Sequence, residues 1–317
     1  MNFLPEDYEA YLAPETDRLS FLRKYLSDRG VQTSVIYLAG KKHIYVNFPS
    51  NSYNPQFKIK TLISHYDIVS GSPGANDNSS ANFALADFAV KVNELALKGK
   101  VLNIRMFFTD GEELGEGGVS EQGSFALAEL FKKLGIENDD VFVFDSVGRG
   151  TVPVLARAGL DVLMNFKKNR PFAKRFALLF ERTQNILREA SPQKWMTLPV
   201  PYSDNAGFLA CGIPAVAITM LPKEEASLYC LELMKDKNLE KTVMNAKLSE
   251  NADFAFKYRE KMPLTWRLFH TEYDNFLSLT PESFKIIEKI LEKLLPLYVL
   301  IFRLYCIKLH KTLEYFV

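Results

Sequence analysis

The sequence FKIKTLISHYD at residues 57–67 carries an alternating apolar run that stops at the polar tetrapeptide SHYD, a pattern typical of a β-strand and its end. A loop containing GANDN at residues 74–78 follows. Residues 80–97 then carry apolar side chains at helical spacing, and Gly99 ends the run. This stretch therefore predicts a strand, a polar loop and a helix in direct succession.

The same alternation continues on both sides of this stretch. The further predicted elements are a helix over residues 16–30, a hairpin with strands at 35–38 and 43–48, strands at 101–108, 141–144 and 215–219, and helices at 124–134 and from about Pro281 onward. This order predicts an α/β protein, a three-layer α/β/α sandwich with a mostly parallel, mixed central sheet. We expect one catalytic domain over residues 1–295, with residues 160–200 as an insertion or a lid-side segment, and an apolar helical tail over residues 296–317.

Composition and charge exclude several classes of protein. The chain has 317 residues, 47% of them apolar and 24% charged, which rules out a collagen-like or disordered chain. The net charge of +1 provides no general attraction to nucleic acid. We find no signal-peptide pattern, and no apolar run of the roughly 18 residues that a transmembrane segment needs. The three cysteines are far apart and odd in number, which favours a reducing, cytoplasmic location.

Polar residues cluster where the predicted strands end. SHYD follows the first of the parallel strands, DGEE at residues 110–113 follows the second, and Asp145 follows the third. FHTEYD at residues 269–274 comes shortly before another helix. Parallel α/β sheets bind ligands in a crevice beyond the carboxyl ends of their strands. We therefore expect these side chains to meet in one crevice.

The expected crevice combines imidazoles with carboxylates, a mixture that suits zinc and related divalent metals. Three carboxylates and one hydroxide would neutralise two divalent ions, so the charges suit a pair of metals. Taken alone, each residue has a simpler interpretation, such as turn chemistry before a helix or a solvated surface charge. Their shared position at the ends of one sheet favours the metal site. The candidate ligands are His65, Asp77, Glu113, Asp145 and His270.

These motifs, taken in order, resemble the zinc-dependent aminopeptidase and glutaminyl cyclase family, which are co-catalytic dizinc exopeptidases. SDN at residues 203–205, followed by CGIP at residues 211–214, is similar to that family's usual SDH…GIP segment. Each motif alone is weak, whereas the ordered set is specific. The resemblance runs from about Lys58 to about Pro281, and its other motifs are SHYD, GANDN, DGEELG, FVFD and FHTEYD.

The resemblance implies how the candidate ligands divide between two metal ions. Asp77 would bridge both ions, while His65 and Asp145 would complete one site, and Glu113 and His270 the other. Zn²⁺ is therefore the expected cofactor, with two ions in a peptidase and one if the chain is cyclase-like. In this family the peptide bond after the bridging aspartate is often cis, so we expect a cis bond after Asp77.

The resemblance also implies catalytic roles for residues that do not bind metal. Glu112 would be the general base that takes a proton from a metal-activated water, and Asp67 would hold the imidazole of His65 in orientation. Tyr202, just before the SDN segment, is a candidate oxyanion donor for substrate binding, and a merely packed aromatic side chain is an equally good interpretation.

Two departures from the family pattern concern substrate preference. The glycine-rich residues 115–123 lengthen a turn that is usually short, and Asn205 stands where the family usually has a histidine. Both changes leave the candidate ligands intact. They put in doubt which substrate side chain is preferred.

Three functions remain open at this level. The first is a zinc metallo-aminopeptidase that releases N-terminal residues from peptides with a free N-terminus. The second is a glutaminyl cyclase that forms N-terminal pyroglutamate on the same scaffold. The third, a non-catalytic binding protein, is disfavoured because all candidate ligands and the candidate base are present. For the tail at residues 296–317, packing on the core, a homo-oligomer contact and binding to a membrane surface are alternatives.

Overall fold

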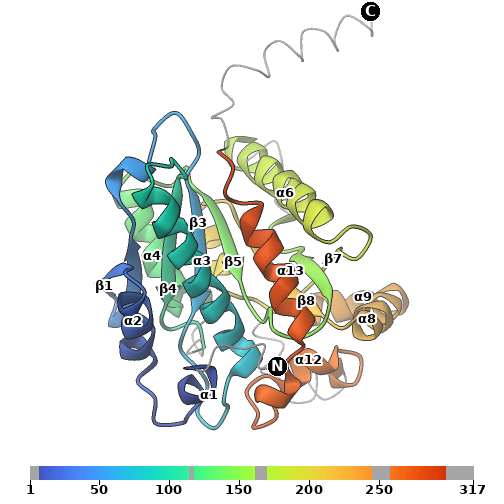
Figure 1. Cartoon of the computed structure of the whole chain (residues 1–317). Helices are drawn as coiled ribbons and strands as arrows, with labels where there is room; N and C mark the ends of the chain where they lie inside the picture. The colour runs from blue at the N-terminus through green and yellow to red at the C-terminus, as the bar shows by residue number, and fades with distance from the viewer. Residues whose placement is uncertain (1–6, 114–117, 161–169, 245–257, 298–317) are drawn as a thin grey trace, which may run out of the picture.

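The computed structural model describes residues 7–113, 118–160, 170–244 and 258–297. In these residues an eight-stranded mixed sheet forms the centre, in the strand order β1-β2-β4-β3-β5-β8-β6-β7 (Figure 1). The strands are β1 (Gln32–Leu38), β2 (Lys41–Asn47), β3 (Lys60–His65), β4 (Ile104–Thr109), β5 (Asp140–Phe144), β6 (Val152–Ala156), β7 (Met196–Leu198) and β8 (Ala215–Leu221).

The four central strands β4, β3, β5 and β8 are parallel, whereas β1 and β2 form an antiparallel hairpin at one side. In register, Lys60 of β3 lies between Ile104 of β4 and Asp140 of β5. Further along, His65 at the end of β3 pairs with Thr109 at the end of β4. The carboxyl ends of these neighbouring strands therefore open at one edge of the sheet, which is the edge that the polar motifs follow.

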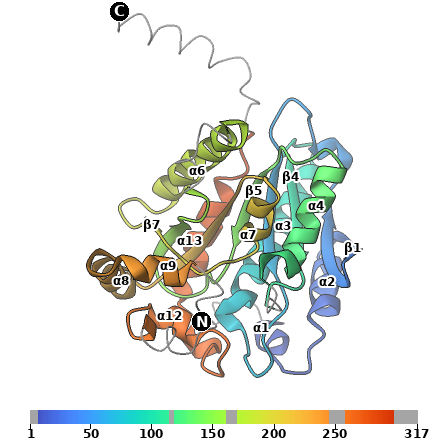
Figure 2. The same cartoon turned by 180° about the vertical axis from the view of Figure 1, so that it is seen from behind.

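Helices cover both faces of the sheet, which confirms the predicted three-layer α/β/α sandwich (Figures 1 and 2). On one face lie α2 (Arg18–Asp28), α3 (Ser80–Leu97), α6 (Arg170–Ala190) and α13 (Pro281–Glu292). On the other lie α4 (Gly123–Lys133), α7 (Asn205–Ala210), α8 (Lys223–Lys235) and α9 (Lys237–Val243). Shorter elements are α1 (Asp7–Tyr11), α12 (Leu264–Leu268), 3₁₀ turns at Ser50–Ser52, Val119–Glu121 and Phe276–Ser278, and a π turn at Ala75–Ser79.

Strand β5 shows why a buried parallel strand is apolar on both faces after its first residue, Asp140. Phe142 and Phe144 belong to the core between the sheet and α3, while Val141 and Val143 belong to the core on the opposite face. Because successive side chains point to opposite faces, a strand covered on both faces has no polar side. All residues of β5 are accordingly buried.

The expectation of an insertion or lid-side segment over residues 160–200 stays a prediction, and the described part of that segment, residues 170–200, packs into the fold. This part contains α6, which packs against α13 and β8. Phe176, Leu179 and Leu187 of this helix are fully buried in the same core as α3. The segment therefore supplies part of one layer of the sandwich.

The predicted tail lies almost entirely outside the described residues, which end at residue 297. The last described part, at Pro296, accepts a hydrogen bond from the buried Lys60 Nζ at 2.7 Å. Among the helices described, none is both long and apolar enough to cross a membrane.

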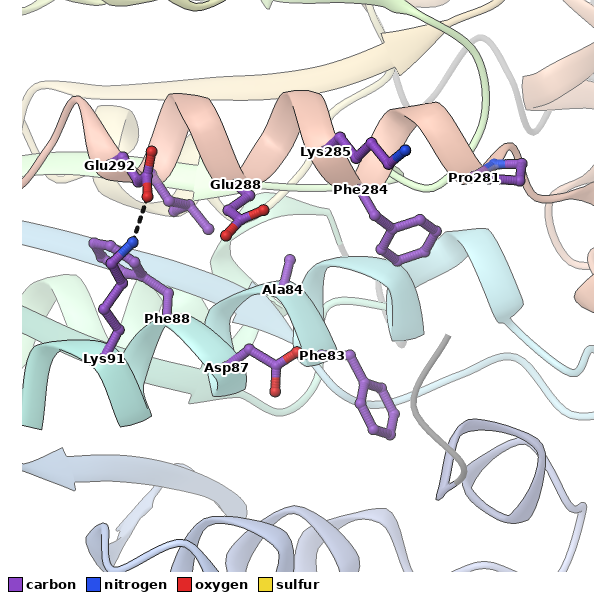
Figure 3. Close-up of a pocket in the computed structure, with 11 residues that line it drawn as sticks. Phe83, Ala84, Asp87, Phe88, Lys91, Pro281, Phe284, Lys285, Glu288 and Glu292 are labelled. Atoms are coloured by element: carbon purple, nitrogen blue, oxygen red, sulfur yellow. Dashed lines mark hydrogen bonds and ion pairs between the residues drawn. The ribbon is translucent and has the colours of Figure 1, made fainter. Parts of the chain in front are cut away.

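A pocket of about 300 Å³ lies between α3 and α13 (Figure 3). Phe83, Phe88 and Phe284 supply its apolar walls, and an ion pair between Lys91 and Glu292 bounds one end. None of the candidate metal ligands lines it. The site described next is therefore separate from this pocket.

Candidate metal centre

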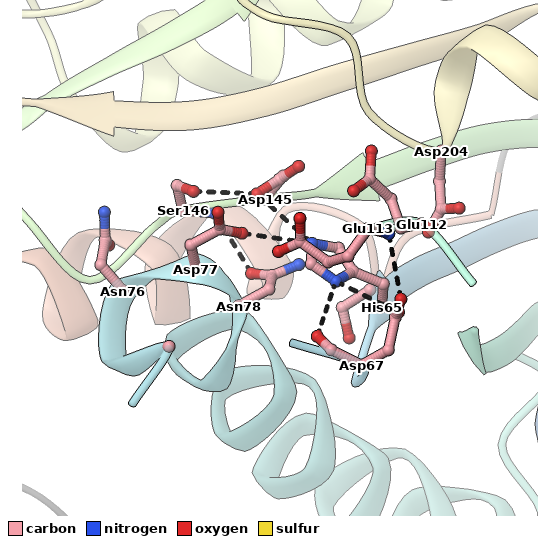
Figure 4. Close-up of polar contacts among 12 residues, drawn as sticks. His65, Asp67, Asn76, Asp77, Asn78, Glu112, Glu113, Asp145, Ser146 and Asp204 are labelled. Atoms are coloured by element: carbon pink, nitrogen blue, oxygen red, sulfur yellow. Dashed lines mark hydrogen bonds and ion pairs between the residues drawn. The ribbon is translucent and has the colours of Figure 1, made fainter. Parts of the chain in front are cut away.

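His65 is the last residue of β3 and its side chain is fully buried, at 0% exposure of the residue. Its Nε2 lies 3.3 Å from Asp77 Oδ1 and 3.9 Å from Asp145 Oδ1 (Figure 4). Asp145 directly follows β5, the neighbouring parallel strand. The parallel register of β3 and β5 therefore brings Asp145 close to the imidazole of His65.

Asp77 comes from the turn that precedes α3, and the peptide bond between Asp77 and Asn78 is cis, as expected. The Asn78 side chain fastens this turn to the end of β5. Its Nδ2 donates to Phe144 O at 3.0 Å, and its Oδ1 accepts from Ser146 N at 3.1 Å. The Ser146 hydroxyl in turn donates to Asp145 Oδ1 at 2.9 Å. Two candidate ligands are thus held by one hydrogen-bonded unit.

The second imidazole lies on the other side of Asp77. His270 Nε2 lies 2.8 Å from Glu113 Oε2 and 3.7 Å from Asp77 Oδ2. The two oxygens of Asp77 therefore face different histidines, with Oδ1 toward His65 and Oδ2 toward His270. A carboxylate with one oxygen toward each of two ligand groups has the arrangement of a bridging ligand.

These groups fit divalent cations. His65, Asp77 and Asp145 offer ligand atoms within 4.8 Å of one another, and so do Asp77, Glu113 and His270. In the part of the chain that the structure describes, His65 Nε2 is buried without a hydrogen-bond partner, although carboxylates surround it. Nitrogen and oxygen donors converging from several directions are the ligand set that zinc prefers.

The pKa values of Asp77, His65 and His270 are all raised, so in the absence of metal these side chains tend to hold protons. Burial, Glu113 and Asp145 raise the pKa of Asp77 to about 7, partly offset by His65. Burial by itself would lower the pKa of His65, but the carboxylates of Asp145, Asp67 and Asp77 raise it well above its usual value. The hydrogen bond with Glu113 is the main reason that the pKa of His270 rises to about 8. Bound cations would take the place of these protons.

Asp67 lies behind His65, away from Asp77. Its Oδ1 is 3.5 Å from His65 Nδ1, and its Oδ2 accepts a hydrogen bond from the backbone N–H of Glu113 at 3.0 Å. Burial opposes the charged carboxylate, yet His65 and the backbone N–H groups lower the pKa of Asp67. Asp67 therefore orients one candidate ligand and fixes the backbone of another.

Glu112 lies beside the same cluster, next to His65 and Glu113 (Figure 4). Its Oε1 accepts a hydrogen bond from Gln122 Nε2 at 3.1 Å. Burial raises the pKa of Glu112 well above its usual value, His65 opposes this, and the neighbouring carboxylates add to it. A carboxyl group with a raised pKa is suited to exchange protons near neutral pH.

Asp204 lies near Glu112 (Figure 4), although sequence reasoning assigned it no role beyond membership of the SDN motif. It is fully buried before α7 and accepts a hydrogen bond from the Thr109 hydroxyl at 2.5 Å. Burial raises the pKa of Asp204 to about 6, and Asp204 in turn raises that of Glu112. Neighbouring Asn205, which replaces the family's usual histidine, is also buried.

Tyr202 lies just before this segment with 39% of its surface exposed. Its role as an oxyanion donor stays a prediction.

His43 lies near the site but is not one of its ligands. It is fully buried on β2, and its Nδ1 accepts the backbone N–H of Asp110 at 3.3 Å. Burial lowers the pKa of His43 to about 4, with Asp67 opposing the shift and Lys41 adding to it. Neutral His43 therefore supports the backbone that leads to Glu112.

The lowered pKa of His43 predicts that the folded chain becomes less stable in acid. Between pH 6.5 and about 4 the unfolded chain binds a proton at this histidine and the folded chain does not. The free energy of unfolding should therefore fall by about 3 kcal/mol as the pH decreases through this window. In urea unfolding of the metal-free chain at pH 7.5 and pH 4.5, His43→Gln should show a smaller decrease than the unmodified chain. Equal decreases in both proteins would contradict the assignment.

Comparisons with known proteins identify the family and the fold of the chain. Residues 44–295 match the family model for Peptidase family M28. The LapA aminopeptidase of Legionella pneumophila shares the fold at 12% identity and a TM-score of 0.58, covering 91% of this chain and 69% of that chain. BSAP, a zinc aminopeptidase from Bacillus subtilis, is 17% identical with a TM-score of 0.50, covering 80% and 49% respectively.

A glutaminyl cyclase has a similar fold too. The enzyme of Porphyromonas gingivalis is 15% identical with a TM-score of 0.56, covering 93% of this chain and 99% of that chain. No curated protein sequence matches the chain. The family match spans most of the chain and contains every strand end and loop that supplies a candidate ligand, so the chain belongs to Peptidase family M28.

Proposed function

We propose that the chain is a zinc-dependent aminopeptidase. The observation that carries this proposal is the position of the Asp77 carboxylate, whose two oxygens face His65 and His270 separately. With Asp145 on one side and Glu113 on the other, these residues would hold two zinc ions. The zinc aminopeptidase of Bacillus subtilis with the same fold supports the choice of metal.

The reaction would be hydrolysis of the first peptide bond. Bound zinc ions would polarise the scissile carbonyl and lower the pKa of a water molecule toward neutrality. Glu112 would take a proton from the attacking water as its oxygen bonds to the carbonyl carbon. When the C–N bond breaks, Glu112 would return that proton to the leaving amine. Its hydrogen bond from Gln122 would hold the carboxylate in position between the two steps.

The cluster also favours a substrate with a free N-terminus. Asp77, Glu113 and Asp145 would be occupied by the zinc ions, and a free α-amine in its neutral form would be drawn to the metal through its nitrogen lone pair. An acetylated N-terminus would lose this attraction.

The free thiols of Cys211 and Cys230 agree with the cytoplasmic location that we propose.

The proposal predicts zinc-dependent release of N-terminal residues. The zinc-loaded chain should cleave tripeptides with a free N-terminus and leave their N-acetylated counterparts intact, as measured by chromatography of the released amino acids. A chelator should abolish release, and zinc should restore it. Cleavage that persists in chelator, or that ignores acetylation, would refute the proposal.

A second candidate is a glutaminyl cyclase, favoured by the nearly complete mutual coverage with the Porphyromonas gingivalis enzyme. A peptide that begins with glutamine separates the two functions. Free glutamine as the product indicates the peptidase. An unshortened peptide carrying N-terminal pyroglutamate indicates the cyclase.

A further inference from the structure

Asp274, the last residue of the FHTEYD motif, accepts hydrogen bonds from the loop that carries Asp77. Its side chain is buried, with the residue 1% exposed. Asp274 Oδ1 accepts the backbone N–H of Asn76 at 2.8 Å, and Oδ2 accepts the backbone N–H of Asp77 at 3.0 Å. Both oxygens of one carboxylate therefore bind consecutive backbone groups, one of which belongs to the candidate bridging ligand.

The backbone of Asp274 adds to this connection. Its carbonyl oxygen accepts the N–H of Ala75 at 3.0 Å, so three successive N–H groups at residues 75–77 are directed to one residue. The Ser278 hydroxyl lies 3.4 Å from Asp274 Oδ1 and steadies the carboxylate from its own turn. Buried N–H groups are costly to leave unpaired, so this arrangement fixes the path of the loop.

The other end of the connection is His270, four residues earlier. The segment between them is a compact turn, in which Asp274 N donates to Thr271 O at 3.2 Å and Thr271 N donates to Leu268 O at 3.2 Å. Asp274 thus joins the segment that supplies His270 to the loop that supplies Asp77.

We propose that Asp274 is a positioning residue that sets the distance between the Asp77 carboxylate and the His270 imidazole, and thereby the affinity of the zinc site that these two residues share with Glu113. The proposal rests on the metal-dependent function proposed above. Asparagine at this position would keep the shape of the side chain but would turn an NH₂ group toward one of the two N–H donors. One hydrogen bond would be replaced by a repulsive contact.

The test is the zinc affinity of Asp274→Asn, measured on the chelator-stripped chain by competition with a chromophoric zinc chelator. Removal of a residue that orients a metal ligand costs about 10–100-fold in affinity, and we expect a loss of that size at one of two zinc sites. Asp139→Asn is the matched control. Asp139 is also buried, accepts a hydrogen bond from Thr61 Oγ1 at 2.7 Å and pairs with Arg105, but it precedes β5, at the end of the sheet opposite the candidate ligands. Its substitution should leave zinc affinity unchanged.

A folded Asp274→Asn chain that binds two zinc ions with unchanged affinity would overturn the proposal. If the variant does not fold, hydrogen exchange of the unmodified chain decides instead. Added zinc should then slow the N–H groups of residues 75–77 together with those of residues 271–274, and independent responses would overturn it. Zinc binding is measured without peptide, so a chain that binds zinc but cleaves nothing refutes the proposed activity and leaves this result standing.

Discussion

Glu112→Gln is expected to reduce the rate of peptide hydrolysis by about 10²–10⁴-fold while the zinc content stays the same. Glutamine has nearly the shape of glutamate but cannot accept a proton from water and return it to the leaving amine. The Gln122 amide donates to Glu112 Oε1 at 3.1 Å, and the carbonyl oxygen of a glutamine at this position could still accept that bond. The loop should therefore keep its structure, and the loss should appear in kcat.

Glu121→Gln is the matched control, because Glu121 is a nearby glutamate in the sequence, at the end of the 3₁₀ turn Val119–Glu121, and is exposed. This control should retain the full rate. Both variants should be assayed with the same tripeptide, and their zinc should be determined by elemental analysis. A Glu112→Gln chain whose rate lies within tenfold of the unmodified chain would remove Glu112 from the proton transfer.

The strands and helices of the centre could be predicted because local signals there agree with the tertiary structure. The predicted helix at residues 80–97 has the bounds of α3, since its apolar spacing and Gly99 mark its extent. The strand predicted at residues 101–108 begins only at Ile104. Asn103 has a positive φ of 50°, and its amide donates to the carbonyls of Asn54 and Phe57. These distant loop contacts override the apolar pattern.

Two parts of the fold could not be found from local pattern. Strand β6 is five residues long and contains Pro153, so it has too little periodicity to be distinguished from a loop. Helix α6 has a clear helical pattern, but nothing in that pattern shows that it packs on β8 and not at the edge of the molecule. A short stretch of sequence does not show which distant element a helix will pack against.

The residues of the candidate site likewise fall into those whose position the sequence predicts and those whose role depends on distant contacts. His65 and Asp145 could be brought together in advance because parallel strands place their carboxyl ends at one edge. Asp204 and Asp274 stand in motifs that the sequence shows, but what they do depends on partners elsewhere in the chain. Asp274 binds backbone N–H groups, and a backbone group gives no signal in the sequence.

Asp77→Ala is expected to abolish hydrolysis by a different route, through loss of metal. It removes the carboxylate whose oxygens face both His65 and His270. Each zinc ion would then keep two of the side chains assigned to it, His65 with Asp145 or Glu113 with His270. Catalytic zinc sites usually have three protein ligands, so both sites should fall below that number.

We expect the zinc affinity of both sites in Asp77→Ala to fall by at least about 10²-fold, since even residues that merely orient ligands cost 10–100-fold. Asp87→Asn is the control, because Asp87 is a carboxylate of α3 that accepts the Tyr25 hydroxyl at 2.6 Å and contacts none of the ligands. Zinc per chain after dialysis is the measurement. An Asp77→Ala chain that retains two tightly bound ions would rule out the bridging role. Together with Glu112→Gln, which should lose the rate and keep the metal, this variant separates holding the ions from moving the proton.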